Sequence, residues 1–337
     1  MSVVNASLPA IPLINVGNAG PLKLLEAERG RAEALIAISR RSYTGLALKI
    51  GDAISRRWLE RSANPYRRQI LAIGDALGMA GAALLNMSFE WTCTSGAAPS
   101  PDGVGNRMLR VLDWRLEGLG QHLVVAREEA PAGVFYNVTW PGAIAVLTAM
   151  APGRFSAAIN QAPMRQYGVT LLGDWAVNRA KVWRSAALPP AHLLRQVFET
   201  ARDYQEAKRM LIETPLCLPV LFTLSGVRPE EGCVIERTET AAVVHDGACA
   251  VANEWRSAHL SGRVRGRDNA ERRRHLERVH GQALSAFEWM VPPILNRFTR
   301  LAVKANAAQG LLRVLGYERE APATAEFHLS HADLAAA

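Results

Sequence analysis

The sequence predicts an α+β protein in which helical layers flank largely antiparallel sheets. Residues from about Pro21 to Asn86 place apolar side chains at helical spacing. After Ser88, short β-like runs alternate with turn residues, and helical patterns return at 191–214 and again from 269. Because hairpin-length connections join neighbouring β-runs, we expect antiparallel pairing, with the helical segments packed as layers on the sheets.

The N-terminal region is predicted to be helical, basic and amphipathic. Asn64-Pro65 interrupts its pattern because the residue before a proline avoids the helical conformation, and a further helix is predicted from Tyr66 to Met79. Two roles fit these helices, namely docking at an anionic lipid interface and covering the sheet. The apolar residues at helical spacing are Leu22, Leu24, Leu25, Ala32, Leu35 and Ile36, then Leu46, Ile50, Ile54 and Leu59.

The β-rich region is predicted to begin with a hairpin. Its first strand is expected at Trp91–Ser95, its turn at Pro99-Ser100-Pro101-Asp102-Gly103 and its return strand at Met108–Trp114. Further strands are predicted at Gln121–Arg127, Val134–Trp140, Ala143–Thr148, Phe155–Asn160, Leu218–Ser225, Gly232–Arg237 and Ala241–His245, and helices at Ala191–Thr200, Tyr204–Thr214, Asn269–Gly281 and Ala283–Glu288.

Size and composition indicate a globular protein with one large core. The chain has 337 residues, of which 49% are hydrophobic and 21% charged. Much of its formal charge of +8 lies between Arg256 and Arg278, a run that indicates either a solvated helix face or attraction to anionic head groups or acidic substrates. We expect no nucleic-acid partner, because no zinc-finger, helix-turn-helix or aromatic ribonucleoprotein pattern accompanies this charge.

No targeting or membrane-spanning segment is predicted. The first residues, MSVVNASLPAIPLINVG, lack the basic start and apolar core of a signal peptide. The most apolar later stretch, Ile70 to Met87, contains Asp75 and three glycines, so it is a poor membrane span. We therefore expect a cytoplasmic protein, with peripheral contact to a membrane left open.

Cys93 is the candidate nucleophile, and the alternative is a buried strand cysteine. None of the four cysteines forms a C-x-x-C pair, and none of the eight histidines lies in a thiol-protease signature. A thiol needs no histidine if the bond before Cys93 is cleaved. The freed α-amine has a pKa of about 7.7–8.0 and a thiol about 8.5, so this amine can accept the thiol proton near neutral pH.

An ordered set of motifs extends on both sides of Cys93, over most of Gly74–Arg300. They are Leu77-Gly78, the stretch Asn86 to Glu90, Cys93-Thr94-Ser95, Arg110-x-x-Asp113, Gly142-Ala-Ile-Ala-Val-Leu-Thr148, Pro152-Gly153-x-Phe155-Ser156, Asn160, Tyr204-x-x-Ala207, Thr214-Pro215-Leu216, Glu231-Gly232-Cys233-Val234-Ile235-x-Arg237, Val251-Ala-Asn253-x-Trp255 and Arg272-Arg273. Together they resemble the family of acid ceramidase and N-acylethanolamine-hydrolysing acid amidase, and more distantly bile salt hydrolase and penicillin V acylase.

This resemblance implies the four-layer αββα sandwich of the N-terminal-nucleophile hydrolases, with a helical N-terminal α-chain. It implies cleavage of the Thr92–Cys93 bond by the chain itself, which yields an α-chain, Met1–Thr92, and a catalytic β-chain, Cys93–Ala337, that stay together. The implied activity is hydrolysis of the amide bond of N-acylated substrates such as N-acylethanolamines or ceramides. No metal or organic cofactor is implied.

The same resemblance assigns roles around the scissile bond. Cys93 is the expected nucleophile, and its freed amine is the expected base. Arg110 matches the arginine beside the thiol, where a cation favours the thiolate. Asp113 matches the aspartate that holds the α-amino group.

Three further positions match the family's site. Asn160 and Asn253 match residues near the oxyanion of the tetrahedral intermediate, where an amide N–H donor is needed. The last active-site arginine matches Arg272 or Arg273, and Arg273 is preferred. Gln161 stands where the family has glutamate, and because glutamine does not titrate, an acid role at that position is lost.

Two alternatives stay open at this point. One is an acylase for small N-acyl compounds, such as penicillin V-like or N-acyl amino acid amides, or an acyltransferase that passes the acyl group to an amine. The other is an uncut, non-catalytic relative that binds lipid without turnover.

Overall fold

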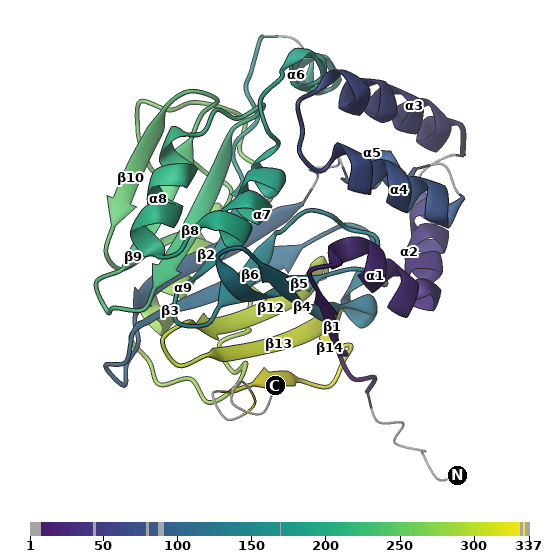
Figure 1. The fold of residues 1–337 in the computed structure, drawn as a ribbon. Coiled ribbons are helices and arrows are strands. Elements are labelled where there is room, and N and C mark those ends of the chain that lie inside the picture. The colour runs from purple at the N-terminus through teal and green to yellow at the C-terminus, as the bar shows by residue number, and fades with distance from the viewer. Residues whose placement is uncertain are drawn as a thin grey trace, which may run out of the picture.

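Two sheets packed face to face form the centre of the molecule (Figure 1). The computed structural model describes residues 8–42, 45–78, 81–86, 91–168, 170–330 and 333. Within these ranges the first sheet has eight strands in the order β1-β4-β5-β6-β7-β8-β9-β10. Their bounds are β1 Leu13–Gly17, β4 Val124–Ala130, β5 Gly133–Thr139, β6 Thr148–Ala151, β7 Phe155–Gln161, β8 Val220–Gly226, β9 Gly232–Arg237 and β10 Ala242–Asp246.

The second sheet has the order β11-β2-β3-β12-β13-β14, with β15 also paired to β13. Among the named strands, only β1 and β4 pair in parallel and all other pairs are antiparallel, which confirms the predicted pairing. The strand bounds are β11 Cys249–Val251, β2 Thr92–Pro99, β3 Asn106–Asp113, β12 Thr299–Asn306, β13 Leu311–Glu318, β14 Ala321–Pro322 and β15 Phe327–Leu329.

Helices cover the outer faces of both sheets. Helices α7 (Pro190–Thr200) and α8 (Tyr204–Glu213) pack on the first sheet, where α7 contacts β4 and β7 while α8 contacts β8 and β9. Helix α9 (Asn269–Val279) packs on the second sheet against β11 and β2. The succession of helix, sheet, sheet and helix is the αββα arrangement that we expected.

The N-terminal helices gather beside the β1 and β4 end of the first sheet (Figure 1). Helix α1 contacts both of these strands, and α3 reaches α6, which lies far along the chain. This region is helical as predicted, except that it opens with β1. The bounds are α1 Gly20–Ala27, α2 Arg29–Ser42, α3 Gly45–Arg61, α4 Arg67–Leu77, α5 Ala82–Asn86, α6 Leu171–Arg184 and the 3-10 helix η1 Leu119–His122.

The β2–β3 hairpin is buried on both faces. Because its side chains alternate between these faces, the candidate residues point in two opposite directions. Cys93 and Leu112 point into the core between the sheets. Leu109 and Val111 point the other way and pack with Leu276 of α9. Because side chains alternate along a strand, two residues three positions apart lie on opposite faces. Arg110 therefore faces the inter-sheet core and Asp113 faces α9.

The predicted helix at Ala283–Glu288 is wrong. This segment runs as bends and turns, since the Glu288 carboxylate accepts the backbone N–H groups of Ser285 at 2.8 Å and Ala286 at 2.7 Å. A side chain that satisfies nearby amides in this way competes with helical hydrogen bonding.

The predicted strand at Ala143–Thr148 is also displaced, because β6 begins only at Thr148. Before it, side chains from other elements take the backbone groups of Ile144: Asn86 accepts its N–H at 2.7 Å, and Arg195 donates to its carbonyl oxygen. Strands β1, β12 and β13 and helix α6 were not predicted. Met79 and residues 87–90, part of the quoted N-terminal patterns, lie outside the described residues.

Candidate active site

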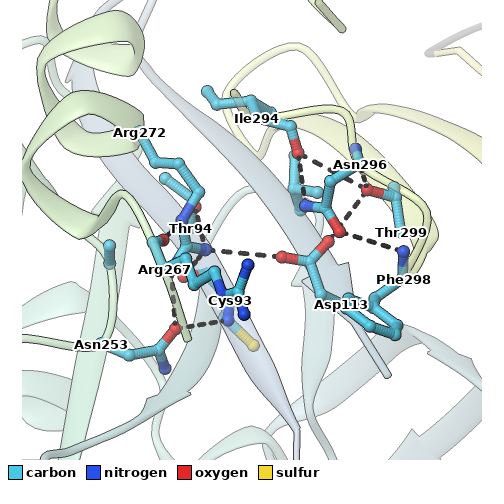
Figure 2. A network of polar contacts seen from close by, with 12 residues as sticks. Cys93, Thr94, Asp113, Asn253, Arg267, Arg272, Ile294, Asn296, Phe298 and Thr299 are labelled. Atoms are coloured by element: carbon cyan, nitrogen blue, oxygen red, sulfur yellow. Dashed lines mark hydrogen bonds and ion pairs between the residues drawn. The ribbon is translucent and has the colours of Figure 1, made fainter. Parts of the chain in front are cut away.

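The free edge of β2 holds Cys93. Strand β11 pairs with β2 as far as Val251 opposite Ser95. Continuing that register by two residues brings Asn253 opposite Cys93. There the Asn253 side chain replaces a backbone partner, and its Oδ1 accepts the Cys93 N–H at 2.7 Å (Figure 2). The nitrogen that cleavage would convert into an α-amine is thus already hydrogen-bonded.

Arg272 of α9 joins the elements around Cys93. Its Nη1 donates to the Cys93 carbonyl oxygen at 3.0 Å and to Thr94 Oγ1 at 2.9 Å. Its Nη2 donates to Asn253 Oδ1 at 3.3 Å, and Nη1 lies 3.4 Å from Asp113 Oδ2. Figure 2 shows this guanidinium between the asparagine on one side and the aspartate on the other. The backbone N–H and the carbonyl oxygen of Cys93 are therefore both hydrogen-bonded to side chains.

Asp113 lies at the end of β3, directly opposite Thr92 in the ladder. The side chain is 3% exposed, and it accepts a hydrogen bond from Thr299 Oγ1 at 2.9 Å. Burial raises the pKa of this carboxyl group, while Arg272 and the Thr299 hydrogen bond act in the opposite direction. The carboxylate is therefore held beside the scissile bond, and Arg272 is its cationic partner.

The Cys93 thiol is fully buried in the uncut chain. Burial raises the pKa of this thiol to about 11, and the charge and hydrogen bond of Arg110 oppose that rise only in part. A desolvated thiol of this kind stays neutral at physiological pH. Ionisation of the Cys93 thiol therefore requires a group that accepts its proton.

Arg110 and Asn160 connect the two sheets behind the thiol. Arg110 Nε donates to Thr148 Oγ1 at 3.0 Å, and its Nη2 donates to the Ile159 carbonyl oxygen at 3.2 Å. Asn160 Oδ1 accepts from Ser95 Oγ at 2.9 Å. The Asn160 Nδ2 atom donates to the carbonyl oxygens of Val251 and Ala252 at 3.1 and 3.0 Å. Both amide hydrogens of Asn160 are thus occupied by backbone.

Arg273 is not brought to this site, and Arg272 takes the place that we expected it to fill. Helix α9 turns its Arg272 side toward β2, so Arg272 is 3% exposed. Arg273 lies one residue further around the helix and pairs with Glu254 and Glu277, at 3.1 Å each. Because neighbouring helix positions differ by about 100° in direction, a sequence match that is uncertain by one residue selects the wrong face.

A cavity of about 1040 Å³ adjoins the scissile bond. Thr92, Asp113, Gln161 and Arg272 contribute to its wall, and Cys93 itself does not. The cavity thus reaches the residue before Cys93 but not the Cys93 side chain.

Two contributors were not singled out as site residues by sequence reasoning. Asn269 accepts from Arg272 Nη2 at 2.7 Å and from the Asn253 backbone N–H at 3.0 Å. Thr299 of β12 donates a hydrogen bond to Asp113. The alternating apolar residues Leu301, Val303 and Ala305 were the sequence signal that could have predicted this strand. Among the described residues, no group of three or more histidine, cysteine, aspartate or glutamate side chains is placed to hold a metal ion.

Comparison with known proteins identifies relatives of this chain. No family model matches it. The acid ceramidase of Heterocephalus glaber is 33% identical over 105 residues, which are 31% of this chain and 25% of that protein. A probable acid ceramidase of Caenorhabditis elegans is 27% identical over 217 residues, or 57% of this chain and 52% of that protein. Over these segments the chain is similar to acid ceramidases.

The chain also shares its fold with a solved structure. The Caenorhabditis elegans N-acylethanolamine-hydrolyzing acid amidase ortholog superposes with a TM-score of 0.50 at 19% identity, over 64% of this chain and 93% of that one. The matches to the two curated acid ceramidases span a quarter and about half of their length. None of the helices in the described part of the chain combines the length and apolar character needed to cross a membrane.

Proposed function

We propose that this chain is the precursor of an amidase that cuts itself between Thr92 and Cys93 and then hydrolyses the amide bond of an N-acylated lipid. One observation supports this most strongly. The Cys93 nitrogen, which would become the catalytic base, is hydrogen-bonded to Asn253, and the Cys93 carbonyl oxygen is hydrogen-bonded to Arg272. Both contacts come from side chains where β11 no longer supplies a backbone partner, so they hold the Cys93 backbone between Asn253 and Arg272.

Self-cleavage begins with the Cys93 sulfur and the carbonyl carbon of Thr92. The thiol proton passes, directly or through a water, to the Cys93 nitrogen as the sulfur adds to that carbon. The bond from carbon to the Cys93 nitrogen then breaks, and the nitrogen, which now bears that proton, becomes the α-amine. The resulting thioester joins the Thr92 acyl group to the Cys93 sulfur. Hydrolysis by water releases the Thr92 carboxylate and regenerates the thiol.

Amide hydrolysis repeats the same chemistry on a substrate. The α-amine accepts the thiol proton, the thiolate attacks the substrate carbonyl, and the leaving amine departs with a proton. Water then releases the fatty acid from the acyl-enzyme. Asp113 would orient the α-amine, and Arg110 would favour the thiolate, because a cation next to a thiol stabilises its ionised form.

Asn253 is the oxyanion donor that the contacts favour. Its Nδ2 donates to the Gln161 carbonyl oxygen at 2.8 Å, which leaves a second N–H on the same nitrogen for the developing negative charge. Asn160 donates both of its amide hydrogens to the chain around Val251 and Ala252. We therefore assign Asn160 to positioning this segment next to Cys93.

The cavity favours a long N-acyl substrate over a small one. Its volume of about 1040 Å³ lies at the upper end of the roughly 300–1,000 Å³ that ligand pockets usually have. Part of its wall is apolar, with Trp91, Met164, Leu171 and Trp175. Such a wall suits an acyl chain, and the similarity to acid ceramidases supports a lipid amide as substrate class.

Mass spectrometry and N-terminal sequencing of the purified protein test the proposal. The expected result is two fragments, one beginning at Cys93, together with amidase activity on long-chain N-acyl amides. A Cys93→Ala variant should remain a single, inactive polypeptide with an unchanged thermal midpoint. A wild-type chain that stays uncut while it hydrolyses these amides would contradict the mechanism, and a chain that is uncut and inactive would contradict the function.

A further inference from the structure

The cavity beside Thr92 is strongly cationic. Among the described residues that line it, six are arginines and three are acids. Arg272 pairs with Asp113, and Arg263 lies 3.7 Å from Asp174. The lining also contains Arg115, Arg267 and Arg297, together with the acids Asp268 and Glu320.

Two of the cavity's arginines lie against an aromatic ring rather than an acid. Arg115 and Arg297 lie over the Phe298 ring, with the guanidinium carbon 5.8 and 4.5 Å from its centre. An aromatic ring attracts a cation but removes none of its charge. A cavity with a fixed cationic surplus favours an anionic ligand.

Gln161 provides an independent sign of a ligand. It lines the cavity, its residue is only 5% exposed, and neither Oε1 nor Nε2 has a hydrogen-bond partner in the described structure. Buried polar side chains in folded proteins are nearly always hydrogen-bonded, so an unpartnered donor and acceptor on a residue of the cavity lining favour a polar ligand nearby.

Part of the cavity lining is apolar and exposed. Leu171 and Leu172 at the start of α6 are 56% and 77% exposed, and Val264 is 55% exposed. The same cavity therefore offers apolar side chains to a hydrocarbon chain and arginines to an anion.

We propose that the substrate of this site is an N-acyl amino acid, an amide whose leaving amine bears a carboxylate. This inference rests on the proposed amidase function and specifies its substrate class. The acyl chain lies along Leu171 and Leu172, and the carboxylate lies among the arginines, with Arg267 and Arg297 as its partners. Gln161 accepts the N–H of the substrate amide at Oε1 and donates from Nε2 to the carboxylate.

The test compares three amides of one long-chain fatty acid on the processed protein: those of glycine, ethanolamine and phosphoethanolamine. Because a hydrogen bond to a charged group is worth more than one to a neutral group, we expect kcat/KM for the glycine amide to exceed that for the ethanolamide by about 10-fold or more. An ethanolamide cleaved equally well overturns the inference and leaves the amidase function standing. A preference for the phosphoethanolamine amide overturns the carboxylate assignment.

A result in which no amide is cleaved overturns the proposed function, and equilibrium binding then decides the subsite. Tighter binding of the glycine amide than of the ethanolamide supports the carboxylate site. Equal binding of the two overturns it.

Charge variants provide a matched control. Arg267→Gln and Arg297→Gln should each lower the ratio of kcat/KM for the glycine amide over the ethanolamide by about 10-fold, mainly through KM. Gln161→Glu should lower this ratio as well, because it replaces a donor with an anion. Arg274→Gln removes an exposed arginine of α9 outside the cavity and should leave the ratio unchanged. An equal effect of Arg274→Gln and Arg267→Gln would show that net charge alone governs selectivity.

Discussion

Arg272 Nη1 donates to the carbonyl oxygen of Cys93 at 3.0 Å, across 179 positions of sequence. The same guanidinium lies 3.4 Å from Asp113, and each of these two side chains is 3% exposed. A buried charge that loses its partner is costly, on the order of 3–5 kcal/mol. The position of the Cys93 backbone therefore depends on α9, a helix that lies far from Cys93 in the sequence.

Arg272 and Arg273 form a matched pair for testing this dependence. In a Cys93→Ala background, where every chain is intact, Arg272→Gln should lower the free energy of unfolding by about 3 kcal/mol because it leaves Asp113 unpaired. Arg273→Gln should change it by less than about 1 kcal/mol, since its ion pairs are partly exposed. Urea unfolding measures both, and equal effects would contradict the assignment of Arg272.

With Cys93 restored, the same two substitutions test cleavage. Arg272→Gln should slow the appearance of the fragment that begins at Cys93, because the Cys93 carbonyl and Asp113 lose their common partner. Arg273→Gln should process like the wild type. A time course followed by mass spectrometry distinguishes the two, and normal cleavage in Arg272→Gln would exclude a role for it in processing.

Asn253 is predicted to have two separable roles. Asn253→Asp retains an oxygen for the Cys93 N–H and for Arg272, so the chain should still cut itself. It loses the Nδ2 donor, so kcat for amide hydrolysis should fall by about 10²–10³ with little change in KM. Asn253→Ala removes both functions and should also impair cleavage. Full hydrolytic activity in Asn253→Asp would rule out this residue as the oxyanion donor.

The two fragments are predicted to stay together after cleavage. Several buried contacts join the segment before Cys93 to α7 and the chain ahead of it. Tyr66 Oη donates to Glu199 at 2.6 Å, Asn64 and His192 hydrogen-bond at 2.8 Å, and Trp58 Nε1 donates to the Ser185 carbonyl at 3.1 Å.

Gel filtration of the processed protein should therefore give one peak that contains both fragments, which separate only in denaturant. A Tyr66→Phe variant, which loses one of these buried hydrogen bonds, should unfold about 1–3 kcal/mol more easily but still co-elute. Dissociation of the wild-type fragments in native buffer would refute the prediction.

Acid is predicted to destabilise the folded chain. Burial lowers the pKa of His192 to about 3, and Arg195 adds to the effect, while burial and Arg107 lower the pKa of His280 to about 3. Between about pH 6.5 and pH 3 the unfolded chain binds more protons at these residues than the folded chain does. The stabilisation is complete above about pH 6.5 and is lost as the pH falls through this window.

The expected loss is several kcal/mol, on the order of 1.4 kcal/mol per pH unit and histidine. Urea unfolding from about pH 7 to about pH 4 measures it. His192→Gln should flatten the slope, whereas His328→Gln, which changes an exposed imidazole, should leave it unchanged. A stability that is constant across this range would show that the two buried histidines do not control it.

Local signals were sufficient to predict the hairpin that contains Cys93. The run that contains Cys93, the turn with Asp102 and Gly103, and the return run to Asp113 are neighbours in sequence. Their pairing therefore follows from alternation and turn chemistry. The same holds for α8, where the Asp203 side chain accepts the Glu206 N–H at 2.8 Å and begins the helix.

Local sequence patterns failed where side chains compete for backbone hydrogen bonds. They also failed where a shift of one residue in the sequence match changes which helix face a side chain occupies. Asn86 and Arg195 take the backbone of Ile144 and so delay β6, while Glu288 prevents a helix that its own segment favours. No local pattern distinguishes Arg272 from Arg273, because the difference lies in which side of α9 meets β2.

The sequence by itself determined the layered α+β class, the candidate thiol and the order of the motifs, since each depends on residues close together along the chain. Only the tertiary structure decided that Arg272 reaches Cys93, that Asn160 is occupied by backbone, and that Gln161 faces an arginine-lined cavity without a partner. Those outcomes depend on how side chains from remote elements pack against one strand, and packing is a property of the folded chain rather than of any segment.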